Sequence, residues 1–108
     1  MARNDFDNLQ PMGFEQLTGI NAATALASPA GSLWSATAGV PGTKARLAIF
    51  CVEGANVRWR DDGTAPTTSV GMRILKDTDM LYVGDLKAIR FIDEAGGGAA
   101  KVNVSYYK

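Results

Sequence analysis

Three pairs of acidic residues are spaced closely enough to bind a metal ion or to act together in catalysis. They are Asp61-Asp62, Asp77 with Asp79, and Asp93-Glu94. Neighbouring carboxylates can bind calcium, or can act as acid and base in a glycosidase when a cleft holds them at a defined separation. None of the three groups has the spacing of an EF-hand loop. Each falls at a predicted turn, where aspartate caps backbone N–H groups. We therefore interpret them as turn residues and predict no metal site and no cofactor.

Other catalytic groups are scarce. The chain has no histidine, which excludes Ser-His-Asp and Cys-His catalysis and histidine metal ligands. The single cysteine, Cys51, cannot form an intrachain disulfide, and it stands in an apolar stretch without a neighbouring cation. We predict an inert, buried thiol. Gly96–Gly98 lacks the Lys-Ser/Thr of a phosphate loop and is interpreted as a hairpin connection. Because none of these groups forms a recognisable catalytic arrangement, we predict that the protein is not an enzyme.

The charge balance bears on the partners of the protein. Eleven basic and eleven acidic residues give a formal net charge of zero, whereas nucleic-acid and polybasic membrane binders need an excess of Lys and Arg. The longest apolar run, Leu47–Val52, is far shorter than the roughly 20 residues of a membrane helix. The segment Met1–Asp5 lacks the apolar region of a signal peptide. We expect a soluble, intracellular product with no nucleic-acid partner and no membrane partner.

Glycine and proline divide the chain from Phe14 onward into pieces of strand length. The expected strands are Phe14–Thr18, Ala23–Ala27, Thr43–Glu53, Asn56–Arg60, Thr67–Leu75 with a break at Gly71, Met80–Val83, Ala88–Ile92 and Ala100–Tyr107, while Leu33–Thr37 is ambiguous. No window shows the spacing of an amphipathic helix. We predict an all-β protein, an antiparallel β-sandwich of about seven or eight short strands over residues 14–108, with a jelly roll as one arrangement. A closed barrel of five or six strands is the alternative.

Alternation along the strands predicts which side chains are buried. The predicted core contains Val57, Trp59, Phe91, Val102 and Val104. Arg58 and Arg60 share the face opposite to Val57 and Trp59. The stretch 43–53 is apolar on both faces in its middle, which indicates a central strand covered on both sides, or covered on its outer face by a neighbouring chain.

The loop after Arg60 holds the most specific motif. Asp62 and Gly63 can form a corner with positive φ, and Pro66 cannot donate to a strand ladder, so we expect Asp61–Pro66 to be an exposed, purely structural loop. The predicted structural turn residues are Asp62, Gly63, Thr64, Pro66, Thr67 and Gly71.

This motif carries a resemblance. The stretch Val57–Gly71, followed by Met80–Gly84, Ile89–Ile92 and Lys101–Tyr107, resembles small virion proteins of tailed bacteriophages. The similarity covers roughly residues 14–107 and does not include the N-terminal arm. It implies a β-sandwich or jelly-roll subunit that joins the particle as a capsid cement or decoration protein, or as a head-tail or tail component. Its partners would be major capsid, neck or tail proteins, and its location the virion after synthesis in the host cytoplasm.

A second resemblance leads to a different class. Asp62-Gly63-Thr64 with Pro66-Thr67 is also similar to a hairpin of immunoglobulin-like accessory modules in sugar-processing enzymes. That similarity implies a carbohydrate-associated binding module. Such modules usually stand in long secreted chains, whereas this chain shows no signal peptide.

Several residues are candidates for contact with a partner. Residues 1–13 form a predicted arm whose apolar side chains Phe6, Leu9 and Met12 fit no strand period and have no evident place in the core. Trp34 stands among serine and threonine, so it either anchors an interface or packs in the core. Arg58 and Arg60 either pair with acidic residues or contact another chain. We expect a symmetric homo-oligomer, dimer or trimer, with the arm ordered against a neighbour.

Overall fold

The computed structural model of the chain describes residues 11–26, 45, 47–84 and 86–107. In these residues it contains strands and no helix. The eight strands are β1 (Pro11–Leu17), β2 (Thr24–Ala25), β3 (Leu47–Glu53), β4 (Val57–Arg60), β5 (Met72–Ile74), β6 (Asp79–Tyr82), β7 (Arg90–Asp93) and β8 (Lys101–Tyr107). The all-β prediction is confirmed.

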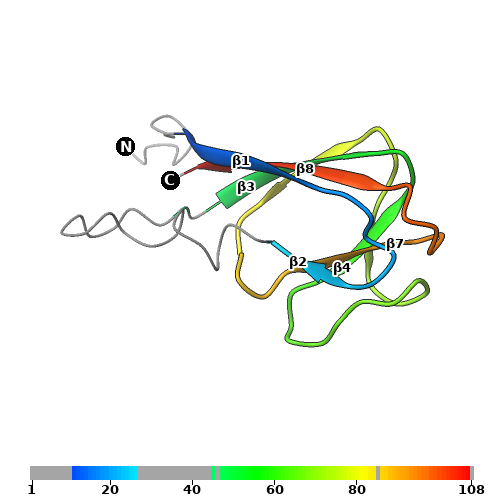
Figure 1. Cartoon of the computed structure of the whole chain (residues 1–108). Helices are drawn as coiled ribbons and strands as arrows, with labels where there is room; N and C mark the ends of the chain where they lie inside the picture. Colours follow the sequence, from blue (N-terminus) through cyan, green and yellow to red (C-terminus); the bar gives the residue numbers. More distant parts are fainter. Residues whose placement is uncertain (1–10, 27–44, 46, 85, 108) are drawn as a thin grey trace.

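The strands form two antiparallel sheets that lie face to face (Figure 1). Sheet 1 has the order β1-β8-β3-β6, and sheet 2 has the order β2-β7-β4-β5. The pairs β4–β5, β3–β6, β2–β7 and β1–β8 are nested inside one another in the sequence and alternate between the two sheets. This strand order is that of an eight-stranded jelly roll rather than a single closed barrel. The predicted β-sandwich is therefore confirmed.

Alternating side chains of the two sheets make the core. In β8, Val102, Val104 and Tyr106 are fully buried, as the alternation predicts. Between the sheets, the rings of Phe50 and Phe91 meet edge to face with their centroids 5.0 Å apart. Of the predicted core residues, Val57, Phe91, Val102 and Val104 are fully buried, while Trp59 is only partly buried and packs against the edge of the core.

Strand β3 is a central strand, as predicted, because it lies between β8 and β6. The prediction of a buried Cys51 is wrong, since this residue is exposed. Phe50 and Val52 are fully buried and occupy the inward positions, so strict alternation places the thiol between them on the outer face. The apolar middle of stretch 43–53 predicts a strand covered on both faces, whereas in the structure the outer face of β3 is buried at Leu47 and exposed at Cys51.

The N-terminal boundary differs from the prediction. Strand β1 begins at Pro11, opposite Tyr107, and Met12 packs against the core of its own sandwich. The prediction that Met12 belongs to an arm with no place in the core is therefore wrong, because β8 is long enough to pair with the segment before Phe14. Phe6, Leu9 and Trp34, together with the ambiguous stretch 33–37, lie outside the described residues.

Two connections between strands also differ from the sequence-based prediction. The expected strand 67–75 is reduced to β5, because Thr67 closes a turn in which its backbone N–H donates to the carbonyl of Val70 at 2.9 Å. Gly96–Gly98 is not a hairpin connection, since it joins β7 of sheet 2 to β8 of sheet 1. Gly96 and Gly98 have positive φ in this crossover, a backbone conformation that glycine adopts without the steric cost of a Cβ.

Candidate functional site

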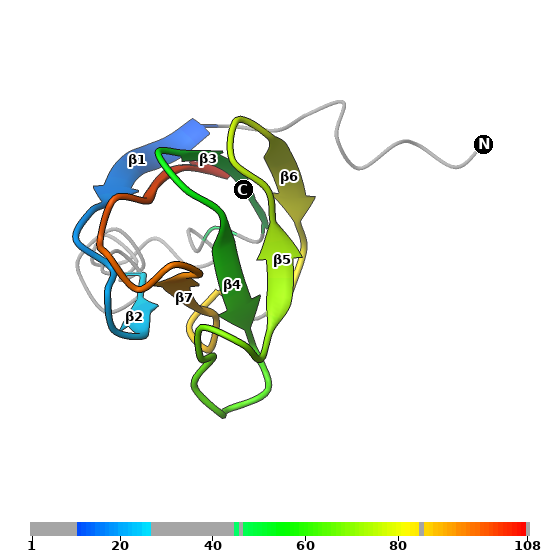
Figure 2. The ribbon, with the colours of Figure 1, turned by 90° about the vertical axis from the view of Figure 1, so that its right-hand side faces the viewer.

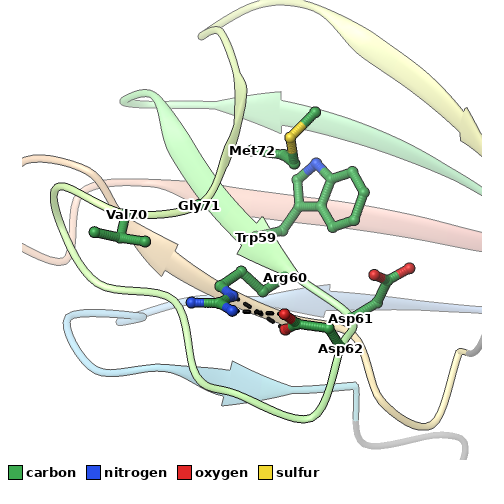
Figure 3. Close-up of a pocket in the computed structure, with 7 residues that line it drawn as sticks. All are labelled: Trp59, Arg60, Asp61, Asp62, Val70, Gly71 and Met72. Carbon is green, nitrogen blue, oxygen red and sulfur yellow. Dashed lines mark hydrogen bonds and ion pairs between the residues drawn. The ribbon is translucent and has the colours of Figure 1, made fainter.

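The β4–β5 hairpin encloses an open pocket at one end of sheet 2. Trp59 pairs with Met72 where the hairpin begins, and the connecting loop then bulges away from the sheet. The pocket has a volume of about 550 Å³. It is lined by Trp59, Arg60, Asp61, Asp62, Val70, Gly71 and Met72, which Figure 3 shows as sticks. We refer to it as the Trp59 pocket.

Trp59 forms the inner wall of this pocket. Its ring meets the ring of Tyr82 edge to face, with centroids 5.7 Å apart and an interplanar angle of 77°. The indole Nε1 is buried and has no hydrogen-bond partner in the described part of the chain. Met72, the cross-strand neighbour of Trp59, is 61% exposed and continues the apolar lining toward solvent. The pocket thus joins the protein core to an exposed apolar surface.

Two carboxylates stand on the rim of the Trp59 pocket, and both are engaged. Asp61 Oδ2 accepts a hydrogen bond from the Tyr82 hydroxyl at 2.6 Å, which links the hairpin of sheet 2 to β6 of sheet 1. Asp62 accepts two hydrogen bonds from one edge of the Arg60 guanidinium, with Nε 3.0 Å from Oδ1 and Nη2 2.5 Å from Oδ2. The hydrogen bond from Arg60 lowers the pKa of Asp62, and the same bond raises the pKa of Arg60. The rim is therefore polar, and its guanidinium offsets one of its two carboxylates.

A second polar cluster holds the outer face of the same hairpin. Glu94 accepts two hydrogen bonds from Arg73, with Nε 2.7 Å from Oε2, and the Asn56 amide donates to it at 3.3 Å. Arg58 Nε lies 3.0 Å from Glu94 Oε2 without the alignment of a hydrogen bond, while its Nη1 donates to the Gly71 carbonyl at 3.0 Å. The hydrogen bond from Arg73 is the main reason that the pKa of Glu94 is lowered.

These contacts bear on the first of the two interpretations of the arginines, pairing with acidic residues. Arg58 bridges the hairpin loop and Glu94, which follows β7, and Arg60 pairs with its near neighbour Asp62. Both side chains therefore have acidic partners within their own chain, as the first interpretation predicted. Arg60 still lines the Trp59 pocket, so it can contribute to a contact surface there.

The predicted turn residues lie together in the hairpin loop. Gly63 has a φ of +88°, and the Asp62 carboxylate accepts a hydrogen bond from the Thr64 N–H at 3.4 Å, so the corner forms where the sequence indicates. Gly71 has a φ of +146°, and a Cβ there would lie 3.1 Å from the Trp59 carbonyl. Pro66 is buried, which contradicts the prediction that the whole of Asp61–Pro66 is exposed, because the loop folds back and brings Pro66 against Gly71.

Sequence reasoning missed the apolar part of the site. Five large apolar residues on or beside β5 and β6 are between 47% and 66% exposed: Val70, Met72, Leu75, Leu81 and Val83. We call this set the apolar edge. Strands β5 and β6 are edge strands of different sheets, and they lie on the same side of the sandwich, opposite to β1 and β2 (Figure 2). The sequence offered a signal, because Val70, Met72 and Leu75 are apolar residues of the expected strand Thr67–Leu75, but the pattern does not indicate which of them are exposed.

Comparison of the chain with protein-family models, with curated proteins and with solved structures finds no match. Among the described residues, no group of three or more Cys, Asp or Glu side chains is placed to bind a metal ion. In the same residues, no helix has the length and apolar character needed to cross a bilayer. The observations that bear on function are thus the jelly-roll sandwich, the Trp59 pocket and the apolar edge.

Proposed function

We propose that this chain is a non-enzymatic structural subunit of a bacteriophage virion. It acts as a capsid cement or decoration protein, or as another head or tail component, and it stabilises the particle by protein–protein contacts. The observation that carries the proposal is the Trp59 pocket with Val70 and Met72, the two residues of the apolar edge that line it. Large apolar side chains exposed along one side of a small soluble domain favour an interaction site, because leaving them in water costs free energy.

The arrangement of this surface supports contact with a protein. Protein interfaces combine an apolar centre, rich in tryptophan, methionine and arginine, with a polar rim that excludes water. Here Trp59 and Met72 form the centre, and the Arg60–Asp62 ion pair forms part of the rim. A neighbouring virion protein would insert an apolar side chain into the pocket, between Trp59 and Val70.

The fold is compatible with this function but does not select it. Jelly rolls occur in viral capsid proteins, in lectins and in cupins, so the architecture alone serves several functions. What favours the virion is the resemblance of residues 14–107 to small phage structural proteins. The apolar edge adds a surface through which such a subunit would bind its neighbours.

One observation favours the second candidate, a carbohydrate-associated module. The Trp59 pocket combines an aromatic ring with two carboxylates and a guanidinium group, and such groups can hydrogen-bond sugar hydroxyls. Both carboxylates already have partners within the chain, Tyr82 and Arg60. A sugar would therefore have to share or displace these hydrogen bonds.

The proposal is tested by particle composition and by one substitution. Mass spectrometry of particles purified from the phage that encodes the chain should find it as a virion component. Met72→Lys should reduce its incorporation at least tenfold, because the charge falls in the apolar centre of the contact. Thr64→Lys adds the same charge at the exposed tip of the same hairpin and should leave incorporation unchanged.

Absence of the chain from particles, or equal incorporation of both variants, would contradict the proposal. Thermal unfolding of Met72→Lys verifies that the fold is intact, and Val70→Lys provides a second exposed position on the same surface. Calorimetric titration with a panel of soluble oligosaccharides tests the second candidate. Binding that is lost in Trp59→Phe would support the carbohydrate module instead.

A further inference from the structure

We infer that two copies of this chain join edge to edge through β6, so that sheet 1 of one copy continues into sheet 1 of the other across a two-fold axis. Strand β6 is an outer strand of sheet 1 and pairs only with β3 among the described strands. This inference concerns a second copy and does not depend on whether the chain is a virion protein.

The edges of the sandwich are protected to different degrees. Soluble proteins guard their sheet edges with proline, with charges or with very short strands, because an open edge pairs with other chains. Strand β1 begins with Pro11 and carries Glu15, β2 has two residues, and β5 has three residues with Arg73 in the middle. Strand β6 and the residue after it, Asp-Met-Leu-Tyr-Val, carry one charge at the first position only. Strand β6 is the least protected of the edges.

The backbone of β6 directs the polar groups of alternate residues away from β3, the one strand that pairs with it among those described. The N–H of Val52 donates to the carbonyl of Thr78 at 3.0 Å, which fixes that pair as hydrogen-bonded within the antiparallel ladder. Because direction alternates along a strand, Met80 and Tyr82 direct their amide groups toward β3. The N–H and C=O groups of Leu81, and those two residues away at Asp79 and Val83, therefore point outward.

The sequence of β6 is self-complementary in one antiparallel register. A two-fold axis at Leu81 places this residue opposite its own copy, Met80 opposite Tyr82, and Asp79 opposite Val83. Each outward-directed residue then meets an outward-directed residue, so the pairs 81–81 and 79–83 can be hydrogen-bonded. The two Asp79 carboxylates lie at opposite ends of the contact, so like charges are not placed opposite one another.

Side chains on the outer face of sheet 1 add apolar area to this contact. Leu81 is 47% exposed and Val83 is 66% exposed, and Leu81 lies beside Ile49 of β3 in the ladder. Pairing with a second copy would bring Leu81 and Val83 of both copies together across the two-fold axis. The contact is isologous, so it closes at two copies and does not propagate into a fibre.

The oligomeric state tests the inference, with a matched control on the opposite edge of the same sheet. We expect the natural chain to sediment as a dimer in analytical ultracentrifugation. Leu81→Lys should sediment as a monomer, because it places two ammonium groups opposite one another. Phe14→Lys changes an apolar residue that is 65% exposed on β1, and it should leave the dimer intact. A monomeric or trimeric natural chain, or equal loss of the dimer in both variants, would overturn the inference.

The register is tested by disulfide formation in a Cys51→Ser background, which removes the exposed natural thiol. Leu81→Cys should cross-link to itself, since directly opposite residues in a hydrogen-bonded pair have Cα atoms about 5.5 Å apart, within reach of a disulfide. The two variants Asp79→Cys and Val83→Cys should form a disulfide-linked dimer when they are mixed with each other. Each variant alone should remain uncross-linked. Cross-linking of either one alone, or failure of the mixture, overturns the register. Loss of particle incorporation in Met72→Lys with an intact dimer separates this contact from the proposed virion contact.

Discussion

At the scale of single residues, Asp93 shows how a carboxylate remains charged inside this protein. The residue is fully buried, and burial opposes ionisation. Backbone N–H groups more than offset that effect, with Ala100 at 2.9 Å from one oxygen and Ala95 at 2.8 Å from the other, so the pKa of Asp93 is lowered. The sequence-based interpretation of Asp93 as a residue that caps backbone N–H groups is confirmed. Its structural role is to join the end of β7 to the start of β8.

This buried carboxylate should make the fold sensitive to acid. Because the pKa is lower in the folded state, Asp93 stabilises the protein above its unfolded pKa of about 4, and this stability is lost as the pH falls through the folded pKa. Asp93→Asn should cost about 1–3 kcal/mol at pH 7, since the amide has one oxygen and leaves one of the two N–H groups without an acceptor. Urea unfolding from pH 7 to pH 2.5 should show a shallower decline for the variant. Parallel declines would contradict this account, although Asp62 and Glu94 leave both proteins some acid sensitivity.

Two glycines with the same φ should respond differently to substitution. Gly54 and Gly63 both have a φ of +88°, but a Cβ on Gly54 would lie 2.1 Å from the Ala99 carbonyl oxygen, whereas a Cβ on Gly63 meets nothing within 4 Å. Gly63→Ala should cost about 1 kcal/mol, from backbone strain alone. Gly54→Ala should cost about 3 kcal/mol or more, because the clash adds to the strain. Chemical denaturation of both variants measures the difference, and equal costs would be inconsistent with the close approach at Gly54.

At the scale of elements, sequence patterns located strands well where one face meets the core and the other meets water. Strand β8 and the start of β4 alternate cleanly, and both were predicted with the correct inward residues. In strand β3 the prediction of a buried Cys51 failed. Leu47 and Cys51 share the outer face of this strand, yet Leu47 is buried and Cys51 is exposed. Burial on an outer face depends on what covers each position, and alternation does not encode that.

The corrected start of β1 leads to a prediction at this scale. A chain that begins at Phe14 lacks Met12, which packs against the core, and the ladder positions opposite Tyr107 and Tyr106. It should fold, but should be about 1–2 kcal/mol less stable than a chain that begins at Pro11. Thermal and urea unfolding of these two chains give the comparison. Equal stabilities would show that residues 11–13 contribute nothing to the sandwich.

At the scale of the whole molecule, local patterns give the fold class but not the topology. Antiparallel pairing of β1 with β8 joins residues almost a full chain length apart, and the order of strands within each sheet is decided by packing between distant segments. The same limit applies to the candidate site. Arg60 and the loop corner were found from the sequence, whereas Val70, Met72 and the Tyr82–Asp61 hydrogen bond come together only in the folded hairpin and across the two sheets.

The nested pairing of strands has a consequence for synthesis on the ribosome. The chain emerges from its N-terminus, so the β4–β5 hairpin can close early, since residues 61–71 that separate its strands are the shortest separation among the four nested pairs. Strand β1 leaves the ribosome first, but its partner β8 is the last of the eight strands to appear. Sheet 1 therefore cannot be completed until translation of β8 has finished, and until then β3 presents an unpaired side to other nascent chains.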